Sequence, residues 1–169
     1  FKLQYRDLDS FIHPDMKGRD DIHYIKRFSE TRLTLNDFDV LLDEMRKQGF
    51  LTMVTPFDEK SVDVIDAQDV DIIKVPSCSF GDWPLLERII KSDKPIIAST
   101  AGASISVMEQ VISFFSHRQK EFSILHCVGE YPTPDENMHI SQIDFLKKRF
   151  PSVRIGFSTH EDTSNTDFI

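Results

Sequence analysis

The feature that most constrains the fold of this chain is a repeated alternation between short apolar runs and stretches with helical periodicity. Runs rich in apolar and β-branched residues occupy residues 1–5, 50–55, 71–77, 95–100, 122–128 and 153–158. Short runs of this kind, bounded by turn-forming residues, are typical of buried parallel strands. Helical stretches follow at least four of the runs after the first. This steady alternation predicts a parallel sheet with right-handed crossover connections.

The helical stretches carry recognisable start signals. Thr34 is expected to cap a helix over residues 34–48, whose inward stripe consists of Phe38, Leu41, Leu42 and Met45. Asp58, Asp82 and Ser104 are expected to cap three further helices. Residues 6–33 are polar and irregular, which predicts a long loop that can include a short helix near residues 21–28.

Two architectures fit this alternation, a doubly wound sheet and a (β/α)8 TIM barrel. The absence of a glycine-rich phosphate fingerprint after the first strand disfavours a dinucleotide-binding sheet. Six strands are too few to close a barrel of this type. Because the chain starts and stops directly beside strand-like runs, both ends are expected to be cut, which would explain the missing strands of an α/β TIM barrel.

The composition narrows the classes of partner. The formal net charge of −8 over 169 residues argues against nucleic acid or an anionic membrane as the main partner. No apolar run approaches the length of a membrane helix. The two cysteines, Cys78 and Cys127, follow no disulfide or metal-finger spacing, so reduced thiols and a cytoplasmic location are expected.

An anionic substrate would need a local basic pocket, because the chain as a whole is negatively charged. The basic residues of the long loop either help to hold such an anion or are simply solvated: Arg6, Lys17, Arg19, Lys26, Arg27 and Arg32.

Polar side chains gather where the predicted strands end. In a parallel sheet these ends lie at one edge, where α/β enzymes keep their chemistry. Lysines and hydroxyls there suit a phosphate or carboxylate, and a histidine suits a metal or proton transfer. The residues in question are Lys2, Gln4, Thr55, Lys74, Ser77, Ser99, Thr100, Gly129, Tyr131, Ser158 and His160. Lys74 stands out because an ammonium group inside an apolar strand is costly unless it meets an anion.

Six short motifs resemble, in order, those of the sialic acid (N-acetylneuraminate) synthase family. They are Phe1-Lys2-Leu3-Gln4, Thr55-Pro56-Phe57-Asp58, Ile73-Lys74-Val75-Pro76-Ser77, Ala98-Ser99-Thr100, Leu125-His126-Cys127 with Glu130-Tyr131-Pro132, and Gly156-Phe157-Ser158-Thr159-His160. The resemblance covers nearly the whole chain. It implies a TIM-barrel fragment that supplies strands two to seven over residues 1–169, without strand one, strand eight or the C-terminal antifreeze-like domain.

The resemblance also implies a reaction and a set of roles. Family members condense phosphoenolpyruvate with an N-acetylated amino sugar, release phosphate and use a divalent metal such as Mn²⁺ or Mg²⁺. Phosphoenolpyruvate would be held by Lys2, Thr55, Lys74, Ser77, Ser99 and Ser158. Gln4 and Tyr131 would face the sugar, His160 would be a metal ligand, and Lys74 would act in catalysis. A homodimer is the common assembly of such enzymes.

Three positions depart from the family pattern. Ser79 stands where the family usually has a glutamate thought to handle the attacking water, and Glu130 is expected to substitute for it. Gly129 replaces a common Asn or Ser, and Thr159 replaces an Asp before the histidine. Two alternatives therefore stay open: a non-catalytic relative that binds a sugar acid or phosphate, and a Schiff-base aldolase that uses Lys74.

Overall fold

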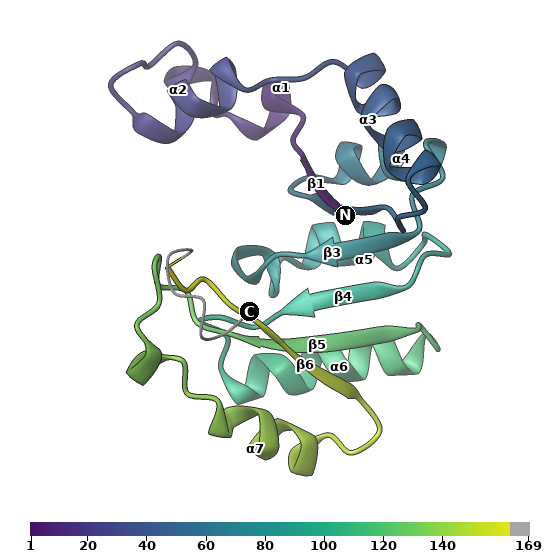
Figure 1. Cartoon of the computed structure of the whole chain (residues 1–169), viewed down its shortest axis with the longest axis vertical. Coiled ribbons are helices and arrows are strands. Elements are labelled where there is room, and N and C mark those ends of the chain that lie inside the picture. Colours follow the sequence, from purple (N-terminus) through teal and green to yellow (C-terminus); the bar gives the residue numbers. More distant parts are fainter. Residues whose placement is uncertain (163–169) are drawn as a thin grey trace. The chain divides into compact units, whose positions relative to one another are not determined.

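The strands of this chain are short, and helices separate all of them. In the computed structural model, residues 1–162 are described. Within that range the strands are β1 (Lys2–Tyr5), β2 (Met53–Pro56), β3 (Ile72–Val75), β4 (Ile96–Ser99), β5 (Phe122–Cys127) and β6 (Arg154–Ser158). The helices are α1 (Leu8–Phe11), α2 (His23–Glu30), α3 (Leu35–Lys47), α4 (Glu59–Ala67), α5 (Trp83–Ile89), α6 (Ile105–His117) and α7 (Ser141–Arg149) (Figure 1). Single 3₁₀ turns are η1 (Pro14–Met16), η2 (Ser77–Ser79) and η3 (Asp135–Asn137).

The chain forms two compact units. The first comprises Phe1–Ile73 and the second begins at Lys74. In the first unit β1 pairs with β2 and β2 with β3, both in parallel. In the second unit β4 pairs with β5 and β5 with β6, again in parallel. The parallel α/β class predicted from the sequence is therefore confirmed within each unit.

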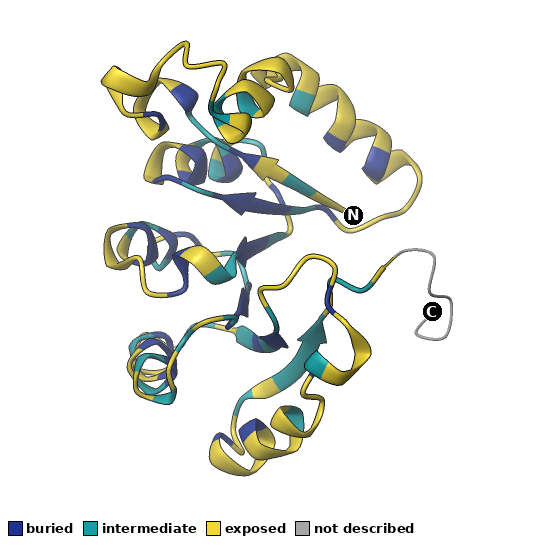
Figure 2. Ribbon diagram, turned by 90° about the vertical axis from the view of Figure 1, so that its left-hand side faces the viewer, coloured by how far each residue is buried: buried dark blue, intermediate teal, exposed yellow. Residues whose placement is uncertain are grey.

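Buried residues concentrate in the strands and on the sides of the helices that pack on them (Figure 2). In the first unit Val54, Val62, Ile65 and Ile73 are fully buried between β2, β3 and α4. Burying each such side chain contributes roughly 1.5–3 kcal/mol. The hydrophobic face of α4 thus fixes the helix against the two strands that it connects.

The predicted helix starts are confirmed. Thr34 caps α3 in a full capping box, in which its hydroxyl accepts a hydrogen bond from the Asp37 amide and the Asp37 carboxylate accepts one from the Thr34 amide. Asp58, Asp82 and Ser104 accept hydrogen bonds from the first turns of α4, α5 and α6. Each cap satisfies a backbone amide that has no partner within the helix.

Some local predictions were wrong. The short helix predicted near residues 21–28 is present as α2, but residues 6–33 also contain α1 and η1, which were expected to be irregular loop. Strand β2 begins at Met53, because Phe50 and Leu51 are exposed in the turn after α3. Leu41 is 39% exposed, so the buried stripe of α3 is narrower than its periodicity indicated and centres on Leu42 and Met45.

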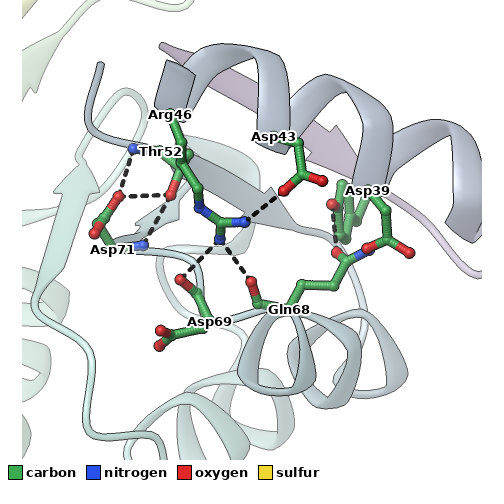
Figure 3. Close-up of polar contacts among 8 residues, drawn as sticks. Asp39, Asp43, Arg46, Thr52, Gln68, Asp69 and Asp71 are labelled. Carbon is green, nitrogen blue, oxygen red and sulfur yellow. Dashed lines mark hydrogen bonds and ion pairs between the residues drawn. The ribbon is translucent and has the colours of Figure 1, made fainter. Parts of the chain in front are cut away.

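A polar network ties α3 to the turn between α4 and β3 (Figure 3). Arg46 donates to the carbonyl oxygens of Gln68 and Asp69 at 2.7 and 3.1 Å. The Gln68 side chain donates to Asp39 at 2.7 Å and accepts from the Tyr5 hydroxyl at 2.6 Å. Burial raises the pKa of the Tyr5 phenol above its ordinary value, which keeps this donor protonated. The network holds the end of β1 against two helices.

Hydrogen bonds between Asp71 and Thr52 connect the start of β3 to the start of β2. The Asp71 carboxylate accepts from the Thr52 amide at 2.7 Å and from the Thr52 hydroxyl at 2.6 Å, and the Asp71 amide donates back to that hydroxyl at 3.1 Å (Figure 3). Thr52 is fully buried. The contact therefore satisfies polar groups that water does not reach.

Both cysteines are free, as the sequence analysis expected. Across residues 1–162, no helix combines the length and the apolar character that crossing a bilayer would require.

We predict that Asp71→Ala lowers the free energy of unfolding by roughly 1–3 kcal/mol, because it leaves the buried Thr52 amide without its acceptor. Urea denaturation followed by circular dichroism measures the change. Asp43→Ala is the matched control. Asp43 forms an exposed ion pair with Arg46 at 3.4 Å, and such a pair contributes less than about 1 kcal/mol. Equal losses in the two variants would contradict the importance of the Asp71 contact.

Candidate active site

Lys74 lies within β3 between two fully buried residues, Ile73 and Val75. Its side chain is only 8% exposed. Burial makes an ammonium group costly unless a negative or strongly polar partner stabilises it. The predicted position of Lys74 in a buried parallel strand is confirmed.

Ser77 connects the turn after β3 to the turn after β4. Its Oγ accepts a hydrogen bond from the Ala101 amide at 3.1 Å. A serine hydroxyl has one donor and two acceptor positions, so this contact leaves the Ser77 proton available for another group. The bond brings two predicted ligand-binding segments of the second unit side by side, those that follow Lys74 and Ser99.

Thr55 and Ser99 are the most informative hydroxyls of the predicted set. Each is 2% exposed and each lies at the carboxyl end of its strand, Thr55 in β2 and Ser99 in β4. Among residues 1–162, neither hydroxyl has a hydrogen-bond partner. A buried hydroxyl without a partner costs about 1–3 kcal/mol. Such groups are kept where a ligand completes them, and both were predicted to hold phosphoenolpyruvate.

Gln4 is brought next to Thr55 by the register of the first unit. The two residues are partners across β1 and β2, and Lys2 is the partner of Met53. The side-chain oxygen Oε1 of Gln4 also accepts a hydrogen bond from the Arg6 guanidinium at 3.1 Å. Lys2, Gln4 and Thr55 therefore belong to the first unit, whereas the other predicted site residues belong to the second, and a common site for all of them stays a prediction.

His160 is held by the segment that follows β5. Its Nδ1 lies 2.9 Å from the Val128 carbonyl oxygen. Because a carbonyl oxygen only accepts hydrogen bonds, the Nδ1 proton is the donor and Nε2 keeps its lone pair in the neutral ring. The Tyr131 ring lies 4.0 Å from the His160 ring between centroids, and the Thr133 amide donates to the His160 carbonyl oxygen at 2.8 Å. The structure thus brings His160 and Tyr131 together.

Ser158 and Gly129 each lie two residues before one of this pair, Ser158 before His160 and Gly129 before Tyr131. Ser158 is the last residue of β6 and the partner of Cys127 across β5 and β6. A Cβ atom on Gly129 would lie 3.6 Å from the Ala101 Cβ, an ordinary contact. Steric crowding therefore does not require a glycine at position 129.

Glu130 is exposed on the connection between β5 and α7. Its carboxylate accepts from the Asn137 side chain at 2.9 Å, and its carbonyl oxygen accepts from the Thr133 hydroxyl at 2.8 Å. These contacts fix the position of Glu130 within the connection. Its role with water stays a prediction.

Sequence reasoning missed several contacts that organise this region. The Val128 carbonyl that orients His160 and the Asn137 amide that holds Glu130 leave no pattern in the sequence. His126 was part of a family-like motif, but its Nε2 donates to the Met138 carbonyl oxygen at 2.8 Å and its ring stacks on Phe157. His126 is therefore a buried structural residue.

The described residues do not form a complete metal site. No group of three or more His, Cys, Asp or Glu side chains within residues 1–162 is arranged to hold a metal ion. The contact of His160 Nδ1 with the Val128 carbonyl oxygen is also the kind of second interaction that orients metal-binding histidines, and the role of His160 as a ligand stays a prediction. One histidine alone makes a weak metal site.

Known proteins share both the sequence and the fold of this chain. A protein from Chromobacterium violaceum assigned to spore coat polysaccharide biosynthesis is 55% identical, with a TM-score of 0.96 over 99% of this chain and 50% of that chain. The N-acetylneuraminic acid synthetase from Leptospira borgpetersenii, in complex with citrate, is 27% identical, with a TM-score of 0.84 over 95% of this chain and 54% of that chain. The spore coat polysaccharide biosynthesis protein SpsE of Bacillus subtilis is 35% identical over 123 residues, which are 72% of this chain and 33% of that protein.

The chain spans half or less of the length of these relatives, apart from 54% of the Leptospira structure. Its six strands match the TIM-barrel chains of the synthase relatives, which confirms the barrel class. The family model described as the NeuB family matches residues 1–169. Since that match runs from the first residue to the last, the chain belongs to the NeuB family.

Proposed function

We propose that this chain is part of an enzyme that condenses phosphoenolpyruvate with an N-acetylated amino sugar and releases phosphate. The product is a sialic-acid-like nonulosonic acid. NeuB proteins are a family of phosphoenolpyruvate-dependent nonulosonic acid synthases. The Leptospira relative, an N-acetylneuraminic acid synthetase, carries the polyanion citrate, which supports an anion site in this fold.

The observation that carries the proposal is the pair of buried hydroxyls without partners at strand ends. The Thr55 hydroxyl in the first unit and the Ser99 hydroxyl in the second can each donate a hydrogen bond to a ligand oxygen. Lys74, in the second unit, supplies a buried positive charge. Phosphoenolpyruvate carries a phosphate and a carboxylate, so it needs cations and several hydrogen-bond donors in a site that excludes water. Lys2, Ser77 and Ser158 would add to this set.

The chemistry assigned to these residues is electrostatic. The enol carbon of phosphoenolpyruvate forms a bond with the aldehyde carbon of the open-chain sugar. Water adds to the resulting cation, and the tetrahedral intermediate then loses inorganic phosphate. Lys74, fixed in β3, would stabilise the negative charge on the phosphate through these steps. Glu130 would take the proton of the attacking water.

The remaining roles follow from position. Gln4 and Tyr131 would contact the sugar. NeuB members use a divalent metal, and His160 would offer Nε2 as one ligand for Mn²⁺ or Mg²⁺. Within residues 1–162 no group of three or more His, Cys, Asp or Glu side chains could hold the metal, so the proposal names His160 alone.

The proposal is tested by isothermal titration of the full 169-residue chain with phosphoenolpyruvate, with and without Mn²⁺. Saturable binding is expected. Phosphate release by the complete protein with N-acetylated amino sugars then tests catalysis, and borohydride trapping with pyruvate tests the aldolase alternative. Binding without phosphate release would indicate the non-catalytic alternative, and no binding at all would contradict the assigned site.

We predict that Lys74→Met weakens phosphoenolpyruvate binding by roughly 10- to 150-fold, because a hydrogen bond to a charged group contributes about 1.5–3 kcal/mol. Methionine fills a similar volume, so the fold should persist. Lys91→Met, at an exposed lysine after α5, is the matched control and should bind like the parent. Unchanged affinity in Lys74→Met would remove Lys74 from the site.

We further predict opposite effects on stability and binding for Thr55→Val and Ser99→Ala. Each variant removes a buried hydroxyl without a partner, so thermal stability should stay level or rise. The same loss should weaken phosphoenolpyruvate binding about three- to tenfold, because a neutral hydrogen bond contributes about 0.5–1.5 kcal/mol.

Thr100→Val is the control for this pair. The Thr100 hydroxyl is buried but donates to the Leu125 carbonyl oxygen at 3.1 Å, so its removal should lower stability. If Ser99→Ala were destabilised as much as Thr100→Val, the Ser99 hydroxyl would have a structural rather than a ligand-binding role.

A further inference from the structure

Three residues of the second unit form a row across neighbouring strands, and the row includes the buried Ser99 hydroxyl. Ser99 at the end of β4 is the register partner of Leu125 in β5, and Leu125 is the partner of Gly156 in β6. Partners in a parallel sheet lie on the same face, and neighbouring strands are about 4.8 Å apart. The Leu125 side chain therefore has Ser99 on one side and Gly156 on the other.

Gly156 makes room for the Leu125 side chain. A Cβ atom at position 156 would lie 2.8 Å from the Leu125 Cδ2 methyl, which is closer than two carbon atoms pack unless one of them moves. None of the other glycines, all of which lie within residues 1–162, would place a Cβ closer than 3.6 Å to a neighbour. Since glycine weakens the interior of a strand, this close approach explains its presence in β6.

Hydrogen bonds and ring packing hold the backbone around this row in place. The Leu125 carbonyl oxygen accepts from the Thr100 amide and from the Thr100 hydroxyl, both at 3.1 Å. On the opposite face of the sheet the His126 ring stacks on the Phe157 ring, with 5.8 Å between their centroids, which joins β5 to β6 a second time. Because the strands are held together, a side chain at position 156 would be accommodated by rotation of the Leu125 side chain.

The direction of that rotation matters for Ser99. With glycine at position 156, the Cδ2 methyl of Leu125 lies over β6. A Cβ at position 156 would push this methyl into another staggered conformation, and the neighbour on the other side of the row is Ser99. The Ser99 hydroxyl is buried and has no hydrogen-bond partner among residues 1–162. A methyl group moved toward it would compete with the ligand oxygen that the proposed site requires.

We propose that Gly156 is a positioning residue of the anion site that contains Ser99. Because Gly156 has no side chain, Leu125 leans toward β6, and the space beside the Ser99 hydroxyl is kept for an oxygen atom of the ligand. Gly156 itself touches no ligand and acts through Leu125. The inference rests on the proposed function, because it takes Ser99 as a residue that binds phosphoenolpyruvate.

Isothermal titration of Gly156→Ala with phosphoenolpyruvate, in the full 169-residue chain, tests the proposal. The affinity should fall about three- to tenfold, as for Ser99→Ala, because the same hydrogen bond is lost. The thermal midpoint should stay near that of the parent, since rotation of one methyl group relieves the contact. Gly81→Ala is the matched control and should bind like the parent, because its Cβ would lie 3.7 Å from Val107 Cγ1, an ordinary contact. Unchanged affinity in Gly156→Ala, or failure of this variant to fold, would overturn the proposal.

Two double variants separate positioning from packing. Leu125→Val shortens the side chain by one carbon, so Gly156→Ala/Leu125→Val should recover the parent affinity for phosphoenolpyruvate to within about twofold. Ser99→Ala/Gly156→Ala should bind as tightly as Ser99→Ala alone, because the contact through which Gly156 acts is already gone. No recovery in the first double variant, or losses that add in the second, would show that Gly156 does not act through Leu125 and Ser99.

Phosphate release by the complete protein separates this inference from the proposed function. If the chain binds phosphoenolpyruvate but the complete protein releases no phosphate with N-acetylated amino sugars, the synthase assignment fails, and the Gly156 variants still decide the positioning role. If phosphate is released and Gly156→Ala binds phosphoenolpyruvate like the parent, the positioning role fails alone. If the parent chain does not bind phosphoenolpyruvate, both assignments fail.

Discussion

Parallel pairing of short strands is the constraint on which the rest of this structure depends. Within each unit, parallel register sends every carboxyl end to the same edge of the strands. The helices cover the strand faces, which leaves the apolar interior dry. Gln4 is exposed at the end of β1, but Thr55 and Ser99 are buried at the ends of β2 and β4. A buried polar side chain in such a place either has a hydrogen-bond partner or lacks one.

Both cases occur at these edges, and the contrast separates structure from function. Thr100 is buried and has its acceptor, the Leu125 carbonyl oxygen, whereas the neighbouring Ser99 is equally buried and has no partner among residues 1–162. Thr52, at the opposite end of β2 from Thr55, is fully satisfied by Asp71. Thr52 and Thr100 have hydrogen-bond partners, whereas the Thr55 and Ser99 hydroxyls have none among residues 1–162. Under the proposed function, a ligand rich in oxygen atoms would supply the missing partners.

Local signals in the sequence were sufficient for most of the fold and for the burial of the site. Capping residues such as Thr34 and Asp58 act within a few residues of the chain, so they could be predicted without the structure. The start of β2 and the exposure of Leu41 could not, because they depend on which apolar residues find a tertiary partner. The location of Lys74 and Ser99 near the carboxyl ends of buried strands was predicted from the apolar runs around them. The contact of His160 with the Val128 carbonyl oxygen could not be predicted, because every residue has a backbone carbonyl and the sequence does not indicate which one accepts.

Charge adds a second constraint, because an acidic protein that is to bind an anion must build its positive potential locally. Lys74 is a positively charged residue within a buried strand. Low polarity strengthens the attraction between such a charge and an anion, so a lysine in this position would suit the anion of the proposed reaction.

Ser79 stands where the resemblance to the sialic acid synthases leads us to expect a glutamate that handles the attacking water. Ser79 is buried in η2 and its hydroxyl lies 3.9 Å from the Cys78 sulfur. A serine hydroxyl is a poor proton acceptor near neutral pH, so it does not replace a carboxylate as a general base. Glu130 has the required group. Its carboxylate accepts a hydrogen bond from the Asn137 side chain, whereas Thr133 contacts its backbone carbonyl oxygen. The Asn137 contact limits the rotamers of the carboxylate, and a carboxylate that is already ordered loses less entropy when it engages water in a transition state. In the proposed enzyme the general base would therefore lie in the connection after β5 and not in the turn after β3.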